Sequence, residues 1–385
     1  MTGIDVAAVR AALAEELPGA GELRRWLHSR PCVSGSERPT RDAVLAALPD
    51  GAVTPVADSG ALVRIGGDGP AVGLRAELDA LPVTERTGVA WAADDGAMHA
   101  CGHDVHLAAL VAVCRALDRL GPPPVPVLAV LQPREETYPS GARDIVASGL
   151  LDGVRAMVGA HVQPVLPAGT VACTPGGVNA SADEFAVTMR GPGGHAAYPQ
   201  RTSDPVLALS QFVVSAQQIV ARDADPMVPA VVTVGALTAG EAANAIPDRA
   251  TARGTLRAMS EDQRGVLWRR VREVADGVAA THGCAADVTL TEGEPLLVND
   301  ADLAGRAARV LGAFGHRVSE PLRSCGADDF SYYTAAAPSL MMFAGTDHAD
   351  PGATLHRPTF LPGDDAIGHV ADALLAAYLA AAGLA

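Results

Sequence analysis

The stretch HDVHLAALVAVCRALDRLGPPPVPVLAVLQP, residues 103–133, decides the fold because it joins a helical pattern to a buried strand. Residues 103–120 have the apolar spacing of a helix, and residues 125–133 form a nearly continuous apolar run. The pattern continues outward, with apolar runs at 71–78 and 156–162 and a helical segment at 140–151. Such alternation is typical of a mainly parallel sheet with helices on both faces, so the sequence predicts an α/β fold.

A different order of elements begins at about residue 181. Strand-like segments at 183–191, 230–237, 250–259 and 286–293 are interleaved with helical segments at 203–222 and 260–283. This β-α-β-β-α-β order predicts an inserted ferredoxin-like α+β domain. The α/β pattern then returns with an apolar strand at 339–345 and a helix at 365–382. We therefore expect a catalytic domain in two parts, 1–180 and 293–385, with an inserted domain at 181–292.

Size and charge restrict the kind of partner. At 385 residues the chain is longer than one hydrophobic core usually supports, which also favours two domains. The net charge of −15 argues against nucleic acid and anionic membranes as partners, because both are bound through clustered Lys and Arg. A small-molecule ligand is the expectation that remains.

The N-terminal segment and the cysteines indicate the compartment. Asp5, Arg10 and Glu15 interrupt the apolar core that a signal peptide needs, so we expect a cytoplasmic protein. A run of about 18 uncharged apolar residues is missing from the sequence, so we expect no membrane-spanning helix. The six cysteines are widely scattered, which favours free thiols over a disulfide framework.

Polar residues follow the predicted strands at the ends where open α/β sheets carry their ligands. Thiolate, imidazole and carboxylate groups at one edge of a sheet suit zinc or a similar transition metal. The start of the predicted helix in MHACGHDVH (98–106) adds a cysteine and a histidine to this edge. The residues are Glu77, Asp79, Cys101, His103, Glu135, Glu136, His161, Asp347, His348 and His356.

Two other interpretations of MHACGHDVH remain open. Cys101 could be a nucleophile with His103 as its base, although neighbours so close in sequence rarely reach the in-line geometry that this needs. His99 and His106 are expected to be hydrogen-bonded residues of a helix end rather than ligands. For Cys101 and His103 a metal site is the favoured hypothesis.

Seven motifs, in this order, resemble those of the metal-dependent amidohydrolases that include aminoacylases, hippurate hydrolases and hydrolases of indole-acetyl amino-acid conjugates, within a metallopeptidase superfamily. Each motif alone would be weak, but together they span residues from about 70 to 360, which makes the resemblance strong. The motifs are LRAELDALP, MHACGHDVH, LQPREE, GAHVQPVLPAG, GGHAAYP, NAIPDRATARGTLR and LHRP.

The resemblance implies a catalytic domain with two divalent metal ions, zinc or manganese, cobalt or nickel. Five protein ligands exceed the number that one tetrahedral catalytic zinc takes, so the count favours two metals. The Cys101 sulfur is expected to bridge them. The implied ligands are Cys101, His103, Glu136, His161 and His356.

Further roles follow from the same resemblance. Glu135 resembles the general base, and Asp79 resembles the aspartate that orients the ligands. Glu77 stands where the wider superfamily often has a metal-binding histidine, which argues against Glu77 as a ligand. His195 is implied to reach the active site of a partner subunit and to stabilise the reacting oxygen.

Two more residues of the inserted domain are candidates for substrate binding. Asn244 and Arg257 offer an amide and a guanidinium group, which together supply matched donors for a substrate carboxylate. The inserted domain is further implied to act as a lid and to form a homodimer or higher homo-oligomer.

The predicted reaction is hydrolysis of the amide bond of N-acyl amino acids or related amides, with Glu135 taking the proton of the attacking water. A dinuclear-metal exopeptidase acting as a dipeptidase or carboxypeptidase is the nearest alternative. A non-catalytic metal-binding protein and a cysteine hydrolase are the others.

Overall fold

The structure is a computed structural model that describes residues 4–347 and 354–384. It forms two compact units. The first takes its residues from 1–176, 298–322 and 329–385, and the second from 177–297 and 323–328. The sequence places the domain boundaries at 180/181 and 292/293, whereas the units divide at 176/177 and 297/298 and residues 323–328 join the second unit. The two units are described separately below.

The first unit is built on an eight-stranded sheet whose four central strands are parallel. Its outer pairs β1·β2, β2·β4 and β6·β16 are antiparallel, and β15 is parallel to β6. The prediction of an α/β fold with a mainly parallel sheet is thereby confirmed. In spatial order the strands are β1 (Ala52–Val56), β2 (Gly60–Ile65), β4 (Val127–Gln132), β3 (Val72–Glu77), β5 (Ala156–Gln163), β16 (Ser339–Gly345), β6 (Thr170–Ala172) and β15 (Arg317–Val318).

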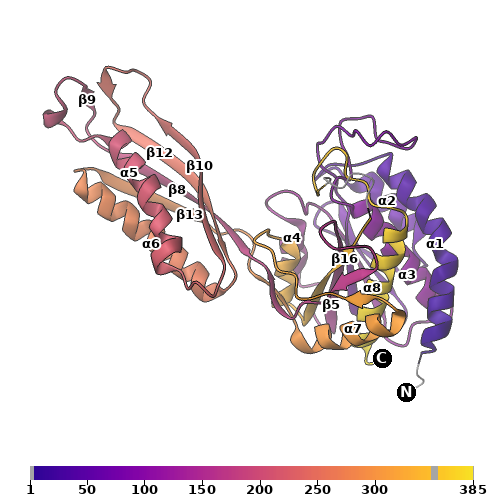
Figure 1. The fold of residues 1–385 in the computed structure, drawn as a ribbon. Coiled ribbons are helices and arrows are strands. Elements are labelled where there is room, and N and C mark those ends of the chain that lie inside the picture. Colours follow the sequence, from indigo (N-terminus) through magenta and orange to yellow (C-terminus); the bar gives the residue numbers. More distant parts are fainter. Residues whose placement is uncertain (1–3, 348–353, 385) are drawn as a thin grey trace. The chain divides into compact units, whose positions relative to one another are not determined.

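Helices cover this sheet on both faces (Figure 1). The helices α3 and α8 pack against each other and against the central strands, and α1 packs on α3. On the other face α4 contacts β4 and the 3₁₀ segment η3. The elements are α1 (Val6–His28), α2 (Arg38–Ala47), α3 (His103–Asp118), α4 (Gly141–Ala147), α7 (Ala301–Phe314), η3 (Asp329–Ala335) and α8 (Asp365–Ala382).

The start of α3 is fixed against strand β5. Its N-cap residue Gly102 has φ +86°, and a Cβ at this position would lie 2.5 Å from Cγ2 of Val162. Only glycine combines this left-handed conformation with so close an approach. The first turn of α3 is therefore held beside the end of β5, where the predicted ligand His161 lies.

Among the described residues one helix, α8, is long and apolar enough to cross a membrane on length and composition alone. Its mean hydropathy is 1.3, and 78% of it is buried in the fold. Because α8 packs against α3, α7 and β5, its apolar surface belongs to the core of the first unit.

The second unit contains a four-stranded antiparallel sheet with both of its long helices on one face (Figure 1). Every second residue of its strands faces these helices, which gives a core that includes Phe185, Phe212 and Leu256. In chain order the elements are β8 (Ser181–Arg190), α5 (Pro205–Gln218), β10 (Ala230–Ala239), β12 (Arg249–Ala258), α6 (Glu261–Thr281) and β13 (Ala285–Thr291). The sheet order is β10-β12-β8-β13.

Short elements complete the chain. Strands β9 and β11 form a two-stranded ribbon, as do β7 and β14. The bounds are β7 (Gly176–Asn179), β9 (Gly194–His195), η1 (Pro199–Arg201), the π-helical turn η2 (Ile219–Asp223), β11 (Ala245–Ile246) and β14 (Leu297–Asn299).

Asp183 joins β8 to α6 inside the second unit. Its buried carboxylate accepts hydrogen bonds from Arg264 Nη2 (2.6 Å) and Nε (2.8 Å), from Trp268 Nε1 (2.7 Å) and from the Gly293 amide (3.1 Å). We predict that Asp183→Asn lowers the free energy of unfolding by about 3–5 kcal/mol, because the Arg264 guanidinium loses its buried counter-charge and keeps only exposed carboxylates nearby. Equilibrium urea unfolding followed by circular dichroism measures this change.

The matched control is Glu292→Gln. Glu292 faces the same guanidinium at 3.5 Å, but its side chain is 71% exposed. An exposed ion pair contributes only about 0–1 kcal/mol, so this variant should unfold close to the wild type. Equal losses in both variants would contradict the assignment.

Candidate metal centre

The candidate ligands meet at one edge of the first unit's sheet. Because β3, β4 and β5 are parallel neighbours, their carboxyl ends lie side by side. Asp79 follows β3, Glu135 and Glu136 follow β4, and His161 lies near the end of β5. The start of α3 adds His103 to the same edge.

The structure brings all five predicted ligands into one connected group. Donor atoms of Cys101, Glu136 and His356 lie within 4.8 Å of one another, and so do those of His103, Glu135 and Glu136. The Cys101 Sγ lies 3.4 Å from His161 Nε2. Sulfur, nitrogen and oxygen donors at this spacing fit a site for more than one divalent cation.

His103 is prepared to act as a ligand through Nε2. Its Nδ1 donates a hydrogen bond to the Asp79 carbonyl (2.8 Å), which leaves the lone pair on Nε2. That nitrogen is buried and makes no hydrogen bond with any residue in 4–347 or 354–384. Burial and the neighbouring histidines hold the pKa of His103 well below its usual range, so the ring is neutral. A neutral imidazole with an oriented partner on Nδ1 is the form that binds metals.

The backbone of His356 is hydrogen-bonded to the loop that carries Cys101. The His356 amide donates to the Ala100 carbonyl (2.8 Å), and the residue has φ +67°. Its Nε2 lies 3.5 Å from Oε1 of Glu136. His356 is thereby placed beside Cys101 although about 250 residues separate them in the chain. His348, which the sequence also singled out, lies outside the described residues.

Asp79 holds the loop that carries Glu135 and Glu136. Its buried carboxylate accepts hydrogen bonds from the Glu136 amide (3.0 Å) and from Ser34 Oγ (2.7 Å). Burial raises the pKa of Asp79, and the hydrogen bonds from Glu136, Ser34 and Glu135 oppose that rise. The same residue orients His103 through its carbonyl, so Asp79 links two candidate ligands.

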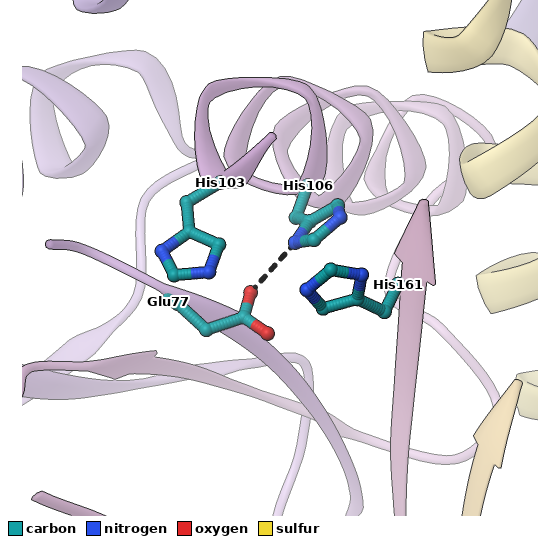
Figure 2. A group of neighbouring side chains, drawn as sticks. All are labelled: Glu77, His103, His106 and His161. Carbon is teal, nitrogen blue, oxygen red and sulfur yellow. Dashed lines mark hydrogen bonds and ion pairs between the residues drawn. The ribbon is translucent and has the colours of Figure 1, made fainter. Parts of the chain in front are cut away.

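Glu77 lies with His103, His106 and His161 in a buried group whose donor atoms are within 4.8 Å of one another (Figure 2). Its carboxylate is paired with Arg75 and accepts a hydrogen bond from His106 Nδ1 (2.9 Å). The other ring nitrogen of His106 accepts from the Val162 amide (3.0 Å). Since both nitrogens of His106 are engaged, this group positions the end of β5 rather than offering a third metal site.

His195 and Asn244 lie together on the ribbon of the second unit. Ala245 pairs with His195, and the Ala196 amide donates to the Asn244 carbonyl (3.1 Å). The His195 ring is exposed, and its Nδ1 accepts from the Ala197 amide (3.0 Å). The ring hydrogen is therefore on Nε2, which makes this nitrogen a hydrogen-bond donor.

Arg257 lies in the four-stranded sheet of the second unit, at the end of β12 farther from the ribbon. It is opposite Ala182 near the start of β8, whereas Arg249, which follows the ribbon, is opposite Arg190 at the end of β8. Arg257 is eight positions after Arg249 in β12, which corresponds to about 26 Å along the strand. Within a single copy, Arg257 is thus remote from Asn244 and His195.

A charge network that joins α1 to the first turn of α3, beside the candidate metal centre, was not predicted from the sequence. Arg24 of α1 donates to Asp104 (3.1 Å), the residue after His103, and to Asp364 (2.8 Å) before α8. His28 Nδ1 lies 3.0 Å from the same Asp104 oxygen, and Nε2 lies 3.2 Å from Glu85. A signal was present in the sequence, because Arg24 and His28 fall on the same face of α1 as its buried apolar residues, among them Ala20.

Known proteins resemble nearly the whole chain. Residues 73–380 match the family described as peptidase family M20/M25/M40. An N-acetylcysteine deacetylase of Bacillus subtilis is 33% identical over 90% of this chain and 92% of its own length. The IAA-amino acid hydrolase ILR1-like 2 of Arabidopsis thaliana is 36% identical over 90% of this chain and 81% of its own length.

A solved structure extends the likeness to the fold. The YXEP protein of Bacillus subtilis, a dinuclear metal binding peptidase, has a TM-score of 0.84 with 30% identity over 96% of this chain and 99% of its own. Together with the site, these relatives define a metal-dependent amidohydrolase, as the motifs predicted. The chain belongs to peptidase family M20/M25/M40.

His28 gives stability a specific pH dependence. Burial opposes its charge, but Asp104 and Glu85 outweigh burial and raise the pKa of His28 from 6.5 to about 9. A raised pKa stabilises the fold fully below pH 6.5, and this contribution disappears as the pH rises through about 9. We predict a loss of about 3 kcal/mol in the free energy of unfolding across this range.

Urea unfolding of the metal-free protein at pH 6.5 and pH 9.5 measures this loss. The control is His28→Gln, which cannot titrate and should show a flatter profile between the two values. If wild type and variant decline in parallel, the pH dependence comes from other groups.

Proposed function

We propose that the protein hydrolyses the amide bond of N-acyl amino acids at a centre of two divalent cations. One observation carries the proposal. The Glu135 carboxylate lies 3.8 Å from His103 Nε2, within a connected set of thiol, imidazole and carboxylate donors. A binding site alone has no need of an extra carboxylate at this position, whereas hydrolysis needs a base.

The donor set fits divalent metals of the zinc, manganese, cobalt and nickel group. We propose that Cys101, His103, Glu136, His161 and His356 would hold the cations. Cations bound there supply a water of lowered pKa and polarise the substrate carbonyl. The buried lone pair of His103 Nε2 supports this assignment.

Glu135 performs the proton transfers in the proposed reaction. Its side chain is 13% exposed, so it reaches the site while remaining largely shielded from solvent. Glu135 accepts a proton from the attacking water and returns it to the departing nitrogen. The products are a carboxylic acid and an amino acid, as the names of the deacetylase and amino acid hydrolase relatives suggest.

We further propose that the second unit is a lid and that two copies of the chain assemble through it. A substrate held by Arg257 and by the His195–Asn244 ribbon at once requires two copies, because within one copy Arg257 lies about 26 Å along β12 from Arg249, the residue that follows the ribbon. Strand β10 is an outer strand, and α5 contains no charged residue while exposing Leu207 and Val214. An uncharged helix beside an open strand edge suits pairing with a second chain.

A cytoplasmic location is part of the proposal, as is the absence of nucleic-acid and membrane partners. The net charge of −15 supports the second statement, since phosphate-rich surfaces repel such a protein.

Chelation tests the reaction. Treatment with excess chelator should abolish hydrolysis of N-acetyl amino acids, and added zinc, manganese, cobalt or nickel should restore it.

Glu135→Gln should keep the metal content but lower kcat by about 10²–10⁴-fold. Parallel assays on dipeptides separate an amidohydrolase from an exopeptidase. The name of the dinuclear metal binding peptidase relative is the reason to test for peptidase activity. Activity that survives chelation would refute the proposal.

Complementation tests the two-copy arrangement. His195→Ala and Arg257→Ala should each be nearly inactive alone. Mixed under conditions of subunit exchange, they should recover about one quarter of wild-type activity, because half of the dimers are mixed and each has one intact site. The result that excludes sites shared between copies is a mixture as inactive as its components.

A further inference from the structure

Glu37 is a buried carboxylate that the proposed reaction does not use. It lies directly before α2 (Arg38–Ala47) and is 0% exposed. Its Oε1 accepts hydrogen bonds from the amides of Gly35 (2.8 Å) and Arg134 (2.9 Å), and its Oε2 accepts from Ser59 Oγ (2.6 Å). A carboxylate is withdrawn from water only where such donors replace it.

The Arg134 amide belongs to the residue immediately before Glu135. Arg134 has φ +51°, a left-handed backbone conformation that residues other than glycine adopt at a cost in free energy. Its guanidinium is paired with Asp58 and Asp144 on the surface. The surrounding structure must therefore hold this backbone in place.

The loop is also closed on itself just beyond Glu135. The Gly141 amide donates to the Arg134 carbonyl (3.1 Å), and a Cβ on Gly141 would lie 1.9 Å from the Pro133 carbonyl oxygen. No residue with a side chain fits at position 141 without moving the loop. Glu135 is thus carried on a short and tightly packed turn.

Two buried carboxylates accept hydrogen bonds from the amides of the residues directly before and after Glu135. Glu37 holds the amide of Arg134, and Asp79 holds the amide of Glu136. The two are connected, because Glu37 also holds Gly35 while the adjacent Ser34 donates to Asp79. The backbone on each side of the proposed base is fixed by an acceptor from another segment.

We propose that Glu37 is a positioning residue that fixes the backbone of the loop and so sets where the Glu135 carboxylate points. This inference rests on the proposed function, in which Glu135 is the base. A misplacement of about 1 Å at a reacting group can lower a rate by about a hundredfold, so a fixed loop matters. Glu37 itself touches neither substrate nor metal in this assignment.

The test uses three variants of the full chain. Glu37→Leu removes both acceptors and should lower kcat at least tenfold with KM and metal content nearly unchanged. Glu37→Gln keeps Oε1 for the two amides and can donate to Ser59, so it should restore kcat to within a few-fold of wild type. Ser59→Ala is the matched control, because it removes a hydrogen bond from the same carboxylate without touching the loop.

Hydrogen–deuterium exchange of the metal-free variants adds a readout independent of activity. Amides of residues 134–138 should exchange faster in Glu37→Leu than in wild type, and at the wild-type rate in Glu37→Gln and Ser59→Ala. If Glu37→Leu does not fold, Glu37→Asp replaces it, because the shorter side chain withdraws from Arg134 while keeping its charge.

Three results would overturn the inference: unchanged exchange and kcat in the Leu or Asp variant, no rescue by Gln, or an equal loss of kcat in Ser59→Ala. Failure of the proposed function looks different. In that case the wild type itself lacks metal-dependent amidase activity, or Glu135→Gln is as active as wild type.

Discussion

Parallel pairing of β3, β4 and β5 is the constraint on which the candidate metal centre depends. It brings the ends of three chain segments to one edge of the sheet. Asp79 is then close enough to accept hydrogen bonds from Glu136 in the loop after β4 and from His103 at the start of α3. Because the sheet is packed between helices on both faces, a register shift of one residue would turn every side chain of a strand to the opposite face and disrupt the packing on both. The positions of the donor atoms are therefore set by the core before any cation binds.

Around this edge the protein satisfies charges that burial alone would penalise. Arg75 is fully buried and is paired with Glu77 and Asp329, while Arg24 and His28 share Asp104. Compared with well-packed apolar residues such pairs add little net stability, but removing one partner leaves the other uncompensated. Their effect is to fix the positions of the proposed ligands, since each network ends on a residue next to one of them. Asp104 adjoins His103, and His106 holds the amide that follows His161.

The fold class could be predicted from sequence because strands such as 125–133 are apolar on both faces and alternate with helices. The proposed ligands could be named because several ordered motifs coincide, and the structure brings them together. The role of Glu37 could not be predicted, since 97 residues separate it from the amide it holds. Nor could the separation of Arg257 from Asn244, which depends on the antiparallel register of β8 and β12 rather than on residue type.

The place of β16 in the sheet also imposes an order on biosynthesis. This strand, residues Ser339–Gly345, lies between β5 and β6, which the ribosome produces more than a hundred residues earlier. The second unit is nearly continuous in sequence and can pack its helices as soon as β13 emerges. The first unit must wait with a missing central strand until almost the whole chain is made. Until then the edges of β5 and β6 that pair with β16 in the native sheet lack their partner strand and are open to contacts with other chains.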